Sequence, residues 1–455
     1  MPKKKTALTI EERLQQALVP AEEQPYEVPE NWVWVRLGEV VDVLNGDRGK
    51  NYPAKSTLSK EGIPFISAAN LCDNIVVEDD LLCMSEEQYS KLSAGKLMLN
   101  DIVLCIRGSL GKHGKFPFKK GAIASSLVIL RSKDRGRLTD GYVMQYLDVP
   151  LFYDEIKKYD NGTAQPNLAA KNLELFSFPL PPLSEQQRIV ERIEELFAKL
   201  DEAKERLQEV ADSFAVRKAA ILHKAFTGEL IGKQVTELVP LENLVDLIKI
   251  GPFGSSLHES DYIENGIPLV NPKHIVQQRI VPQSKISISD EKAEELSSYK
   301  LKENDIVLGR RGEMGRCAPI SNREENWICG TGSMIIRLKK EYDAKLYSLI
   351  LGSQATVTYL ENSAVGSTLK NLNEKIVRKI PVPQFSNEEQ HEIVRLIDDL
   401  LARERAAKQA TEQALASIDL MKKSILARAF RGELGTNKAS EASALELLRQ
   451  VLAEN

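Results

Sequence analysis

The stretch Asn100–Leu104, which reads NDIVL, recurs unchanged as Asn304–Leu308, 204 residues further along the chain. The same offset relates Gly62–Pro64 to Gly266–Pro268 and serves nearly the whole sequence, with only short slips. Further pairs at this offset are Arg107-Gly108 with Arg311-Gly312, Asn167-Leu168 with Asn371-Leu372, Ile189-Val190 with Ile393-Val394, and Ala225-Phe226 with Ala429-Phe430. Such a period is too long for a solenoid, so the sequence predicts a duplicated domain.

The composition is that of an ordinary globular protein. The chain has 455 residues, of which 42% are hydrophobic and 28% charged, and at roughly 100–200 residues per domain this length predicts two to four domains. The 61 Lys and Arg residues and 65 Asp and Glu residues give a net charge of −4. That balance does not itself indicate a nucleic-acid binder, but it is compatible with one, because basic patches can coexist with acidic helices.

Neither a membrane span nor a secretion signal is expected. No apolar run approaches the roughly 18 residues that a membrane helix needs, and Glu11 and Glu12 stand where a signal peptide would place its apolar core. The five cysteines have no CxxC spacing, so we expect reduced core residues in a cytoplasmic protein, without a disulfide framework or a zinc site. They are Cys72, Cys83, Cys105, Cys317 and Cys329.

Each copy begins with a mixed part, at about 30–180 and 241–383, in which short β-rich runs alternate with Gly, Pro and Asn. Each mixed part ends in a proline block, Phe178–Pro182 in the first copy and Ile380–Pro383 in the second. Because proline neither continues a β-ladder nor sits inside a helix, these blocks predict sharp boundaries.

A long helix is predicted after each proline block. In the first copy Ser184 and Gln187 fit a capping box at its start, and Gly228 fits its end. The apolar spacing alternates between four and three residues, which is the heptad seam of a coiled coil: Ile189, Ile193, Leu196, Leu200, Ala203, Leu207, Val210 and Phe214. The second seam is interrupted at Glu404 and Thr411 and contains Ile393, Ile397, Leu400, Ala407, Ala414, Ile418, Met421 and Ile425.

The connections predict how these helices pair. Two unrelated surface helices would also fit the pattern, but helices of about 40 residues need a partner to bury their apolar stripes. The second mixed part follows helix one through a linker at 231–240 and precedes helix two, so helix two must return towards the first mixed part. We therefore expect an antiparallel coil in a pseudo-two-fold dumbbell, with the mixed parts separated by roughly 60 Å at 1.5 Å per residue.

The same geometry would bring the chain ends together. Thr9 and Glu12 fit a capping box of an N-terminal helix that carries Leu14 and Leu18 on one side. A C-terminal helix would present Leu445, Leu448 and Leu452. The two terminal helices would then be neighbours that jointly dock a partner, the alternative being two independently frayed ends.

Basic residues concentrate where the repeats agree. Between Arg107 and Arg137 nine Lys and Arg residues face one acid, whereas Ser184–Asp212 holds nine acids and five bases. The loops 107–115 and 309–316 share the pattern Arg-Gly-x-x-Gly after a predicted strand. Their glycines permit close backbone approach, and their cations suit phosphates and guanine edges. The alternative is a pair of solvated hairpin tips.

Other polar loops are weaker candidates for the same surface. The Gly-rich turns at 45–50 and 251–256 are equally explained by turn chemistry. The polar loops at 162–167 and 366–371 either cap turns or read adenine edges. The candidate DNA contacts are Arg48, Lys50, Asn70, Arg107, Ser109, Lys112, His113, Lys115, Gln165, Asn167, Ser255, Ser256, Asn271, Lys273, His274, Arg310, Arg311, Arg316, Thr368 and Lys370.

Sequence signatures of catalysis are missing. There is no GxxxxGK[ST] loop, no Asn/Asp-Pro-Pro-Tyr/Phe tetrad of the amino-methyltransferases, no metal-ligand spacing and no nucleophile elbow. Gly330–Gly332 is a lone GxG without the rest of a dinucleotide fingerprint. We therefore expect no catalytic residue and no metal ligand, and a chain that recognises rather than reacts.

Three stretches resemble the specificity (S) subunit of Type I restriction–modification enzymes: Pro29–Gly38 (PENWVWVRLG), Pro179–Val190 (PLPPLSEQQRIV) and Lys224–Leu230 (KAFTGEL). The resemblance covers residues 29–435 and both copies. The second copy departs mildly where Pro383–Gln390 reads PQFSNEEQ.

This resemblance implies a non-catalytic subunit with two target recognition domains, each reading half of a bipartite, asymmetric site in double-stranded DNA. The helices would be the spacer that docks two modification (methyltransferase) subunits, which bring S-adenosylmethionine and methylate adenine N6. Restriction (translocase/nuclease) subunits would use ATP and Mg, so no cofactor would bind this chain directly. The alternatives are a coiled-coil scaffold that binds only protein and a stand-alone enzyme such as a fused methyltransferase, which the missing tetrad disfavours.

The predicted fold class is α+β, with two mixed α/β domains joined by two long helices. The expected order is an N-terminal helical arm at 1–28, target recognition domain 1 at 29–183, a central helix at 184–230, a linker at 231–240, target recognition domain 2 at 241–385, a C-terminal spacer helix at 386–435 and a tail helix at 436–455.

Overall fold

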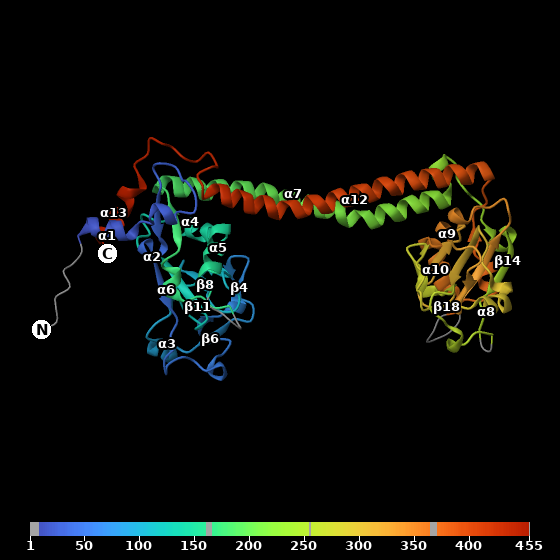
Figure 1. Cartoon of the computed structure of the whole chain (residues 1–455), viewed down its shortest axis with the longest axis horizontal. Coiled ribbons are helices and arrows are strands. Elements are labelled where there is room, and N and C mark those ends of the chain that lie inside the picture. Colours follow the sequence, from blue (N-terminus) through green and yellow to red (C-terminus); the bar gives the residue numbers. More distant parts are fainter. Residues whose placement is uncertain (1–8, 161–165, 254–255, 365–370, 455) are drawn as a thin grey trace. The chain divides into compact units, whose positions relative to one another are not determined.

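A computed structural model describes residues 9–160, 166–253, 256–364 and 371–454 (Figure 1). The chain divides into two compact units. Unit 1 consists of Met1–Arg206 and Ala414–Asn455, and unit 2 of Leu207–Gln413. Each unit combines a mixed α/β domain with parts of two long helices, α7 (Leu183–Thr227) and α12 (Asn387–Ala429), which confirms the predicted mixture of two repeated domains and long helices.

In unit 1 a six-stranded sheet has the order β2-β11-β8-β9-β5-β4, and a four-stranded sheet has the order β6-β3-β10-β7. The strands are β2 (Val41–Asn45), β3 (Ile63–Ile66), β4 (Leu71–Cys72), β5 (Ile75–Val76), β6 (Leu82–Met84), β7 (Lys96–Met98), β8 (Ile102–Cys105), β9 (His113–Lys115), β10 (Lys120–Ile123) and β11 (Leu127–Ser132). The helices of this domain are α2 (Leu37–Val40), α3 (Glu86–Lys91), α4 (Asp140–Tyr146), α5 (Pro150–Tyr159) and α6 (Ala170–Leu173).

Unit 2 repeats the central pairing, with sheets ordered β14-β22-β19-β20 and β18-β15-β21 and a separate hairpin, β16-β17. The strands are β14 (Val245–Ile250), β15 (Ile267–Val270), β16 (Ile275–Val276), β17 (Arg279–Ile280), β18 (Ser287–Ile288), β19 (Asp305–Gly309), β20 (Cys317–Pro319), β21 (Ile328–Cys329) and β22 (Ser333–Leu338). The helices are α8 (Asp290–Glu295), α9 (Ala344–Leu351), α10 (Gln354–Ser363) and α11 (Glu374–Arg378).

The repeated NDIVL stretch builds the centre of each sheet. Its Asn adopts a left-handed conformation, with φ of 69° at Asn100 and 65° at Asn304, which Asn tolerates better than most residues. The buried Asp that follows accepts bidentate hydrogen bonds, Asp101 from Arg131 and Asp305 from Arg337. Ile-Val-Leu then forms a fully buried strand. The stretch therefore recurs because each residue has a distinct structural task in both copies.

The proline blocks differ from the prediction. Pro179 lies inside β12 (Ser177–Leu180), opposite Trp34 of β1 (Val33–Arg36), and Pro381 lies in β23 (Pro381–Val382), paired with β13 (Val239–Pro240). Both ladders have only two strands. Proline is tolerated there because an edge strand does not need an N–H donor on both sides.

The helix α7 has 45 residues and α12 has 43, as the apolar spacing predicts. The expected cap at Ser184 is wrong, because α7 begins at Leu183 and the Pro182 carbonyl accepts from the Gln186 amide. The Ser184 side chain instead hydrogen-bonds Glu441. The second helix does start with a capping box, in which Ser386 and Glu389 exchange hydrogen bonds.

The heptad seam is buried only in part. Ile189 and Ile193 are fully buried, whereas Val210 is 39% exposed and Met421 is 49% exposed. Thr411, expected to interrupt the seam, is buried and donates to the Ala407 carbonyl. Because the Thr411 hydroxyl hydrogen-bonds to a carbonyl of its own helix, the side chain can occupy a buried position that the apolar pattern alone does not predict.

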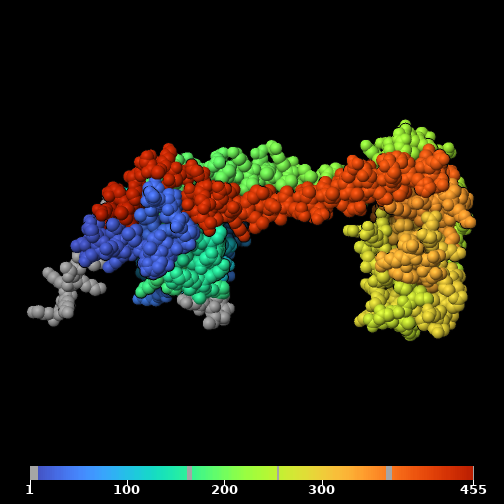
Figure 2. Space-filling view, turned by 45° about the horizontal axis from the view of Figure 1, so that its top comes forward, coloured from blue at the N-terminus to red at the C-terminus, as the bar shows by residue number. Residues whose placement is uncertain are grey.

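The two terminal helices lie together in unit 1, as predicted (Figures 1 and 2). The helix α1 (Ile10–Ala17) has the Thr9–Glu12 capping box, and α13 (Ala444–Glu454) places Arg449 3.8 Å from Glu11. Leu14, Leu448 and Leu452 belong to one buried core.

A polar cluster, which we call the terminal clasp, fixes residues 436–441 to the start of α7. The buried Glu185 accepts from Trp32 Nε1 at 2.7 Å and from Asn437 Nδ2 at 2.8 Å. Arg188 donates both Nη atoms to Glu441, at 2.9 and 2.8 Å. The first domain is therefore completed by the C-terminal end of the chain.

All five cysteines carry free thiols, and only Cys72 is exposed. Burial raises the pKa of the Cys317 thiol to about 12. Within the described ranges, no helix combines the length and the apolarity that crossing a membrane would require.

Candidate nucleic-acid interface

The two Arg-Gly-x-x-Gly loops have the same backbone shape. The first follows β8 and the second follows β19, and all four glycines have positive φ, between 75° and 83°. A Cβ at Gly111 would lie 3.0 Å from the Tyr153 ring, and one at Gly315 would lie 2.5 Å from Val357. Glycine is thus required at these positions by conformation and by packing against the following helices, α5 and α10.

Each cationic loop contacts the asparagine that ends the predicted polar loop of the same copy. Arg107 forms a β-bridge with Asn167 and donates from Nε to its Oδ1 at 3.1 Å. Arg311 forms the matching β-bridge with Asn371, whose buried Oδ1 accepts no hydrogen bond from the described residues. Arg310 donates from Nε to the Leu372 carbonyl at 3.1 Å. The structure therefore places Asn167 and Asn371, at the described ends of the polar loops, beside the cationic loop of their own unit.

The cations of these loops differ in availability. Arg107 and Arg311 are exposed, whereas burial and the neighbouring Arg311 lower the pKa of Arg310. Lys112 donates to the Ala68 carbonyl at 3.0 Å, and Arg316 pairs with Glu313. The other exposed candidates are Arg48, Lys50, Ser109, Lys115, Ser256 and Lys273.

Three candidates lie in the interior. Asn70 is buried and caps a short helix by accepting from Ser67. His274 does the same for Asn271 at the matching position, and burial lowers the pKa of its imidazole. His113 is buried with Nδ1 2.8 Å from the Gly111 carbonyl. These buried side chains hold the backbone of the turns next to them and are not available to contact DNA.

The remaining candidates cannot be placed. Gln165, Ser255, Thr368 and Lys370 lie outside the described residues.

The basic run from Arg107 to Arg137 is less available than its count of charges indicates. Arg131 and Arg135 both pair with the buried Asp101, Lys120 pairs with Glu86, and Arg137 pairs with Asp134. A count of charges within the run misses most of this pairing, because Asp101 and Glu86 lie outside the run and only Asp134 lies within it.

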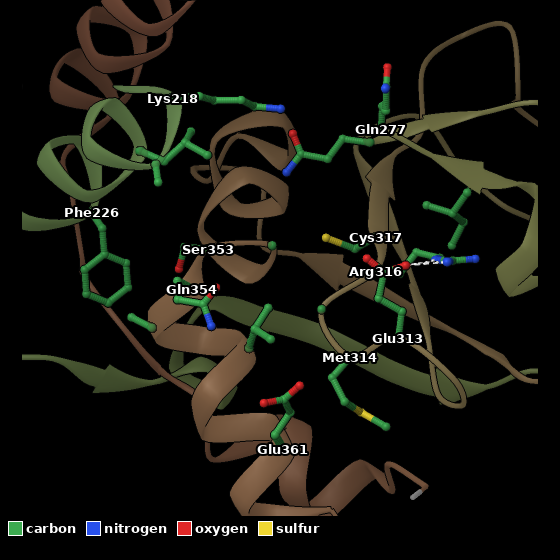
Figure 3. Close-up of a pocket in the computed structure, with 18 of the residues that line it drawn as sticks. Lys218, Phe226, Gln277, Glu313, Met314, Arg316, Cys317, Ser353, Gln354 and Glu361 are labelled. Atoms are coloured by element: carbon green, nitrogen blue, oxygen red, sulfur yellow. Dashed lines mark hydrogen bonds and ion pairs between the residues drawn. The ribbon is translucent and has the colours of Figure 1, made fainter. Parts of the chain in front are cut away.

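A hollow of about 920 Å³ in unit 2 adjoins the second cationic loop (Figure 3). Its walls include Lys218 of α7, Glu313 and Arg316 of the loop, and Gln277 and Gln278 between β16 and β17. These two glutamines and Lys218 were not among the predicted contacts. Asp73 and Asn74, which occupy the matching place in the first copy, are ordinary turn residues, but Gln277 and Gln278 are not, so the second turn has no sequence signal of its own.

Across the described part of the chain, no group of three or more His, Cys, Asp or Glu side chains is arranged to hold a metal ion.

The model of the Type I restriction modification DNA specificity domain matches residues 29–212 and 242–416. The chain is 28% identical to the EcoBI specificity subunit of Escherichia coli, covering 94% of this chain and 93% of that protein. It is 24% identical to the EcoKI specificity subunit of E. coli K12, covering 94% and 96%.

Among solved structures, the fold is similar to that of the HsdS subunit from Thermoanaerobacter tengcongensis, with a TM-score of 0.64 at 19% identity, over 90% of this chain and 99% of that one. The family match spans both repeats and includes both Arg–Asn bridges, Arg107 with Asn167 and Arg311 with Asn371. The chain therefore belongs to the family of Type I restriction–modification specificity subunits.

Proposed function

We propose that this chain recognises a bipartite, asymmetric site in double-stranded DNA, with one half-site read by each mixed domain. The observation that carries the proposal is the repeated β-bridge that places Asn167 beside the exposed Arg107 and Asn371 beside the exposed Arg311. Exposed guanidinium groups can bind phosphates or guanine edges. A scaffold that binds only protein would not need this arrangement twice.

We further propose that α7 and α12 form an antiparallel coiled coil that sets the gap between the half-sites, around a pseudo-two-fold axis. Ion pairs within each unit support this direction. Asp201 pairs with Lys422 and Lys204 with Asp419 in unit 1, so numbers along α12 fall as those along α7 rise. In unit 2, Arg217 pairs with Glu404, which continues the trend.

The chemistry then belongs to partners. Two modification subunits would supply S-adenosylmethionine and methylate adenine N6, and restriction subunits would supply ATP- and Mg-dependent translocation and cleavage. Complex formation is consistent with the relatives, which are named as specificity subunits of multi-subunit restriction enzymes.

The experiment is methylation mapping. The full chain is co-expressed with its cognate modification subunits, and N6-methyladenine is located across the host genome with and without this chain. We expect a split motif whose methylation depends on the chain. Methylation by the purified chain alone, or no chain-dependent motif, would contradict the proposal.

The carrying observation is tested with Arg107→Ala and Arg311→Ala, with Arg395→Ala as the control on an exposed helical arginine that pairs with Glu392. A guanine contact predicts a loss of about 1–3 kcal/mol and relaxation of one position in one half-site. A phosphate contact predicts weaker binding to all sequences and a salt slope lower by about one. Unchanged affinity and motif in the double variant would show that the loops are structural only.

A further inference from the structure

The hairpin β16–β17 has an unusual tip. Ile275 pairs with Ile280 and Val276 with Arg279, which leaves Gln277 and Gln278 as a two-residue loop with φ of 49° and 60°. Positive φ at both central residues defines a type I′ turn, for which Asn-Gly, Asp-Gly and Gly-Gly are the favoured sequences. Glutamine has neither the freedom of glycine nor the short side chain that lets Asn and Asp adopt this conformation.

The matching hairpin in unit 1 has tip residues of the kind that type I′ turns favour. Asp73 and Asn74 form its tip with φ of 48° and 62°, and Asn74 donates to Asp148 of the neighbouring segment. Burial raises the pKa of that Asp148 carboxyl. The backbone shape is thus shared, while the tip residues differ, and only unit 2 places residues there that the turn itself does not favour. This difference indicates that the glutamines serve something other than the turn.

Each hairpin is held beside the cationic loop of its own domain. In unit 1, Ile75 of β5 pairs with Lys115 of β9, directly after that loop. In unit 2, β17 packs beside β20, the strand that follows Arg316. The tip glutamines line the same hollow as Glu313 and Arg316.

The two glutamines have different environments. Gln278 is half-buried, donates from Nε2 to the Ser348 carbonyl at 3.4 Å, and covers Gly352, where a Cβ would lie 2.8 Å from that Nε2. Gln278 therefore positions the tip. Gln277 is exposed and projects outward from the hairpin (Figure 3). Next to it, Val276 is 48% exposed.

We propose that Gln277 is a specificity-determining residue of the second domain that reads an adenine edge, an inference that rests on the proposed function. A glutamine amide can donate to adenine N7 and accept from adenine N6, a pairing that no other base offers in the major groove. The neighbouring Val276 side chain suits the thymine methyl group of the same or an adjacent base pair. Lys218, which lines the hollow, and the exposed Arg311, which directly precedes the lining residue Gly312, would hold the phosphate backbone that flanks this base.

The test uses Gln277→Gly in the full chain, co-expressed with the modification subunits, and reads the methylated motif across the genome. Glycine fits the φ of 49° better than glutamine, so the variant should fold at least as stably as the parent. Loss of specificity could not then be attributed to misfolding, and thermal unfolding checks this directly. Gln208→Ala, which removes an exposed glutamine whose amide donates to Asp212 on the same helix, is the matched control.

We expect one adenine-containing position of one half-site to become degenerate in Gln277→Gly, with discrimination against the wrong base falling roughly fivefold to 150-fold. The other half-site and the gap should be unchanged, as should the motif of Gln208→Ala. An unchanged motif in Gln277→Gly overturns the inference while leaving the proposed function intact. A uniform drop in methylation at all sites, without degeneracy, also overturns it, because it indicates a backbone contact. If the parent complex shows no chain-dependent motif, the proposed function fails and the inference falls with it.

Discussion

Phe430 offers a direct test of how the end of the chain completes unit 1. Its ring is fully buried and stacks on Tyr142 with centroids 4.7 Å apart. The Phe430 carbonyl accepts from the Tyr26 hydroxyl at 3.1 Å. Replacing a fully buried phenylalanine by alanine typically costs about 3–5 kcal/mol, which includes the cavity and the lost ring contact. We expect Phe430→Ala to cost about 4 kcal/mol in unit 1, a large share of the stability of a domain.

The matched variant is Phe226→Ala, because Phe226 occupies the corresponding position of the first repeat and its side chain is only partly buried. A partly exposed ring loses less on truncation, so about half the cost is expected, and in unit 2. Hydrogen exchange measured by mass spectrometry reports local opening free energies for each segment in the intact chain. In Phe430→Ala, α13 and α1 should exchange faster, while β19 and β22 of unit 2 should be unaffected. Equal losses in the two variants, or protection of α13 that survives Phe430→Ala, would refute this account of the terminal packing.

Three further outcomes follow from the same structure. Replacing residues 30–180 with the matching domain of a relative should change one half-site of the methylated motif and leave the other half-site and the gap unchanged. A change in both half-sites would show that the two domains do not recognise DNA independently. Inserting seven residues after both Gln208 and Gln413 lengthens the helices by about 10 Å, or roughly three base pairs. Methylation mapping should then show a gap between the half-sites widened by a few base pairs, or a loss of methylation in a protein that still folds. An unchanged gap would reject the spacer role of the helices. Hydrogen bonds from Arg188 lower the pKa of Glu441, so this pair stabilises the clasp at pH values above the ordinary glutamate pKa of about 4.3 and loses that contribution as the pH falls through the lowered pKa. Spin labels at Glu194 and Ser440 should therefore show a broader distance distribution in acid. The same labels in Glu441→Gln should already show a broad distribution near neutral pH, and one that varies less with pH.

Much of the fold could be predicted from local patterns. The repeat at one offset predicted two similar domains, and the apolar spacing predicted two helices of about 40 residues. The Thr9 and Glu12 pair predicted the start of α1, because all its partners lie within one turn. Features that depend on distant partners were not predictable in the same way. Ser184 matches a cap by its spacing, but its hydroxyl bonds Glu441, which lies more than 250 residues away along the chain.

The candidate site shows the same division. Arg107 and Arg311 were identified because a glycine-bracketed arginine after a strand recurs in both copies. The number of basic side chains available to DNA in the run 107–137 was overestimated, because Arg131 and Arg135 both form ion pairs with Asp101 in the folded sheet. Gln277 was missed because its turn lacks the Asn and Gly residues by which such turns are recognised. An unfavourable residue in a tight turn is visible only when the backbone angles are known.

The terminal clasp also has a consequence for the order in which the protein matures during synthesis. A ribosome completes every residue of unit 2, Leu207–Gln413, before it makes the last segment of unit 1, Ala414–Asn455. Until then the buried Glu185 lacks the hydrogen bonds from Thr436 and Asn437, whereas every residue of unit 2 is already available. Ribosomes that stop between Gln413 and Phe430 would release chains that hold all of unit 2 but lack the segment that packs against Tyr142 in unit 1. Such chains would expose the apolar surface around Tyr142 and Phe178 to chaperones and proteases. The clasp therefore links the folding of the first domain to synthesis of the chain as far as Glu441.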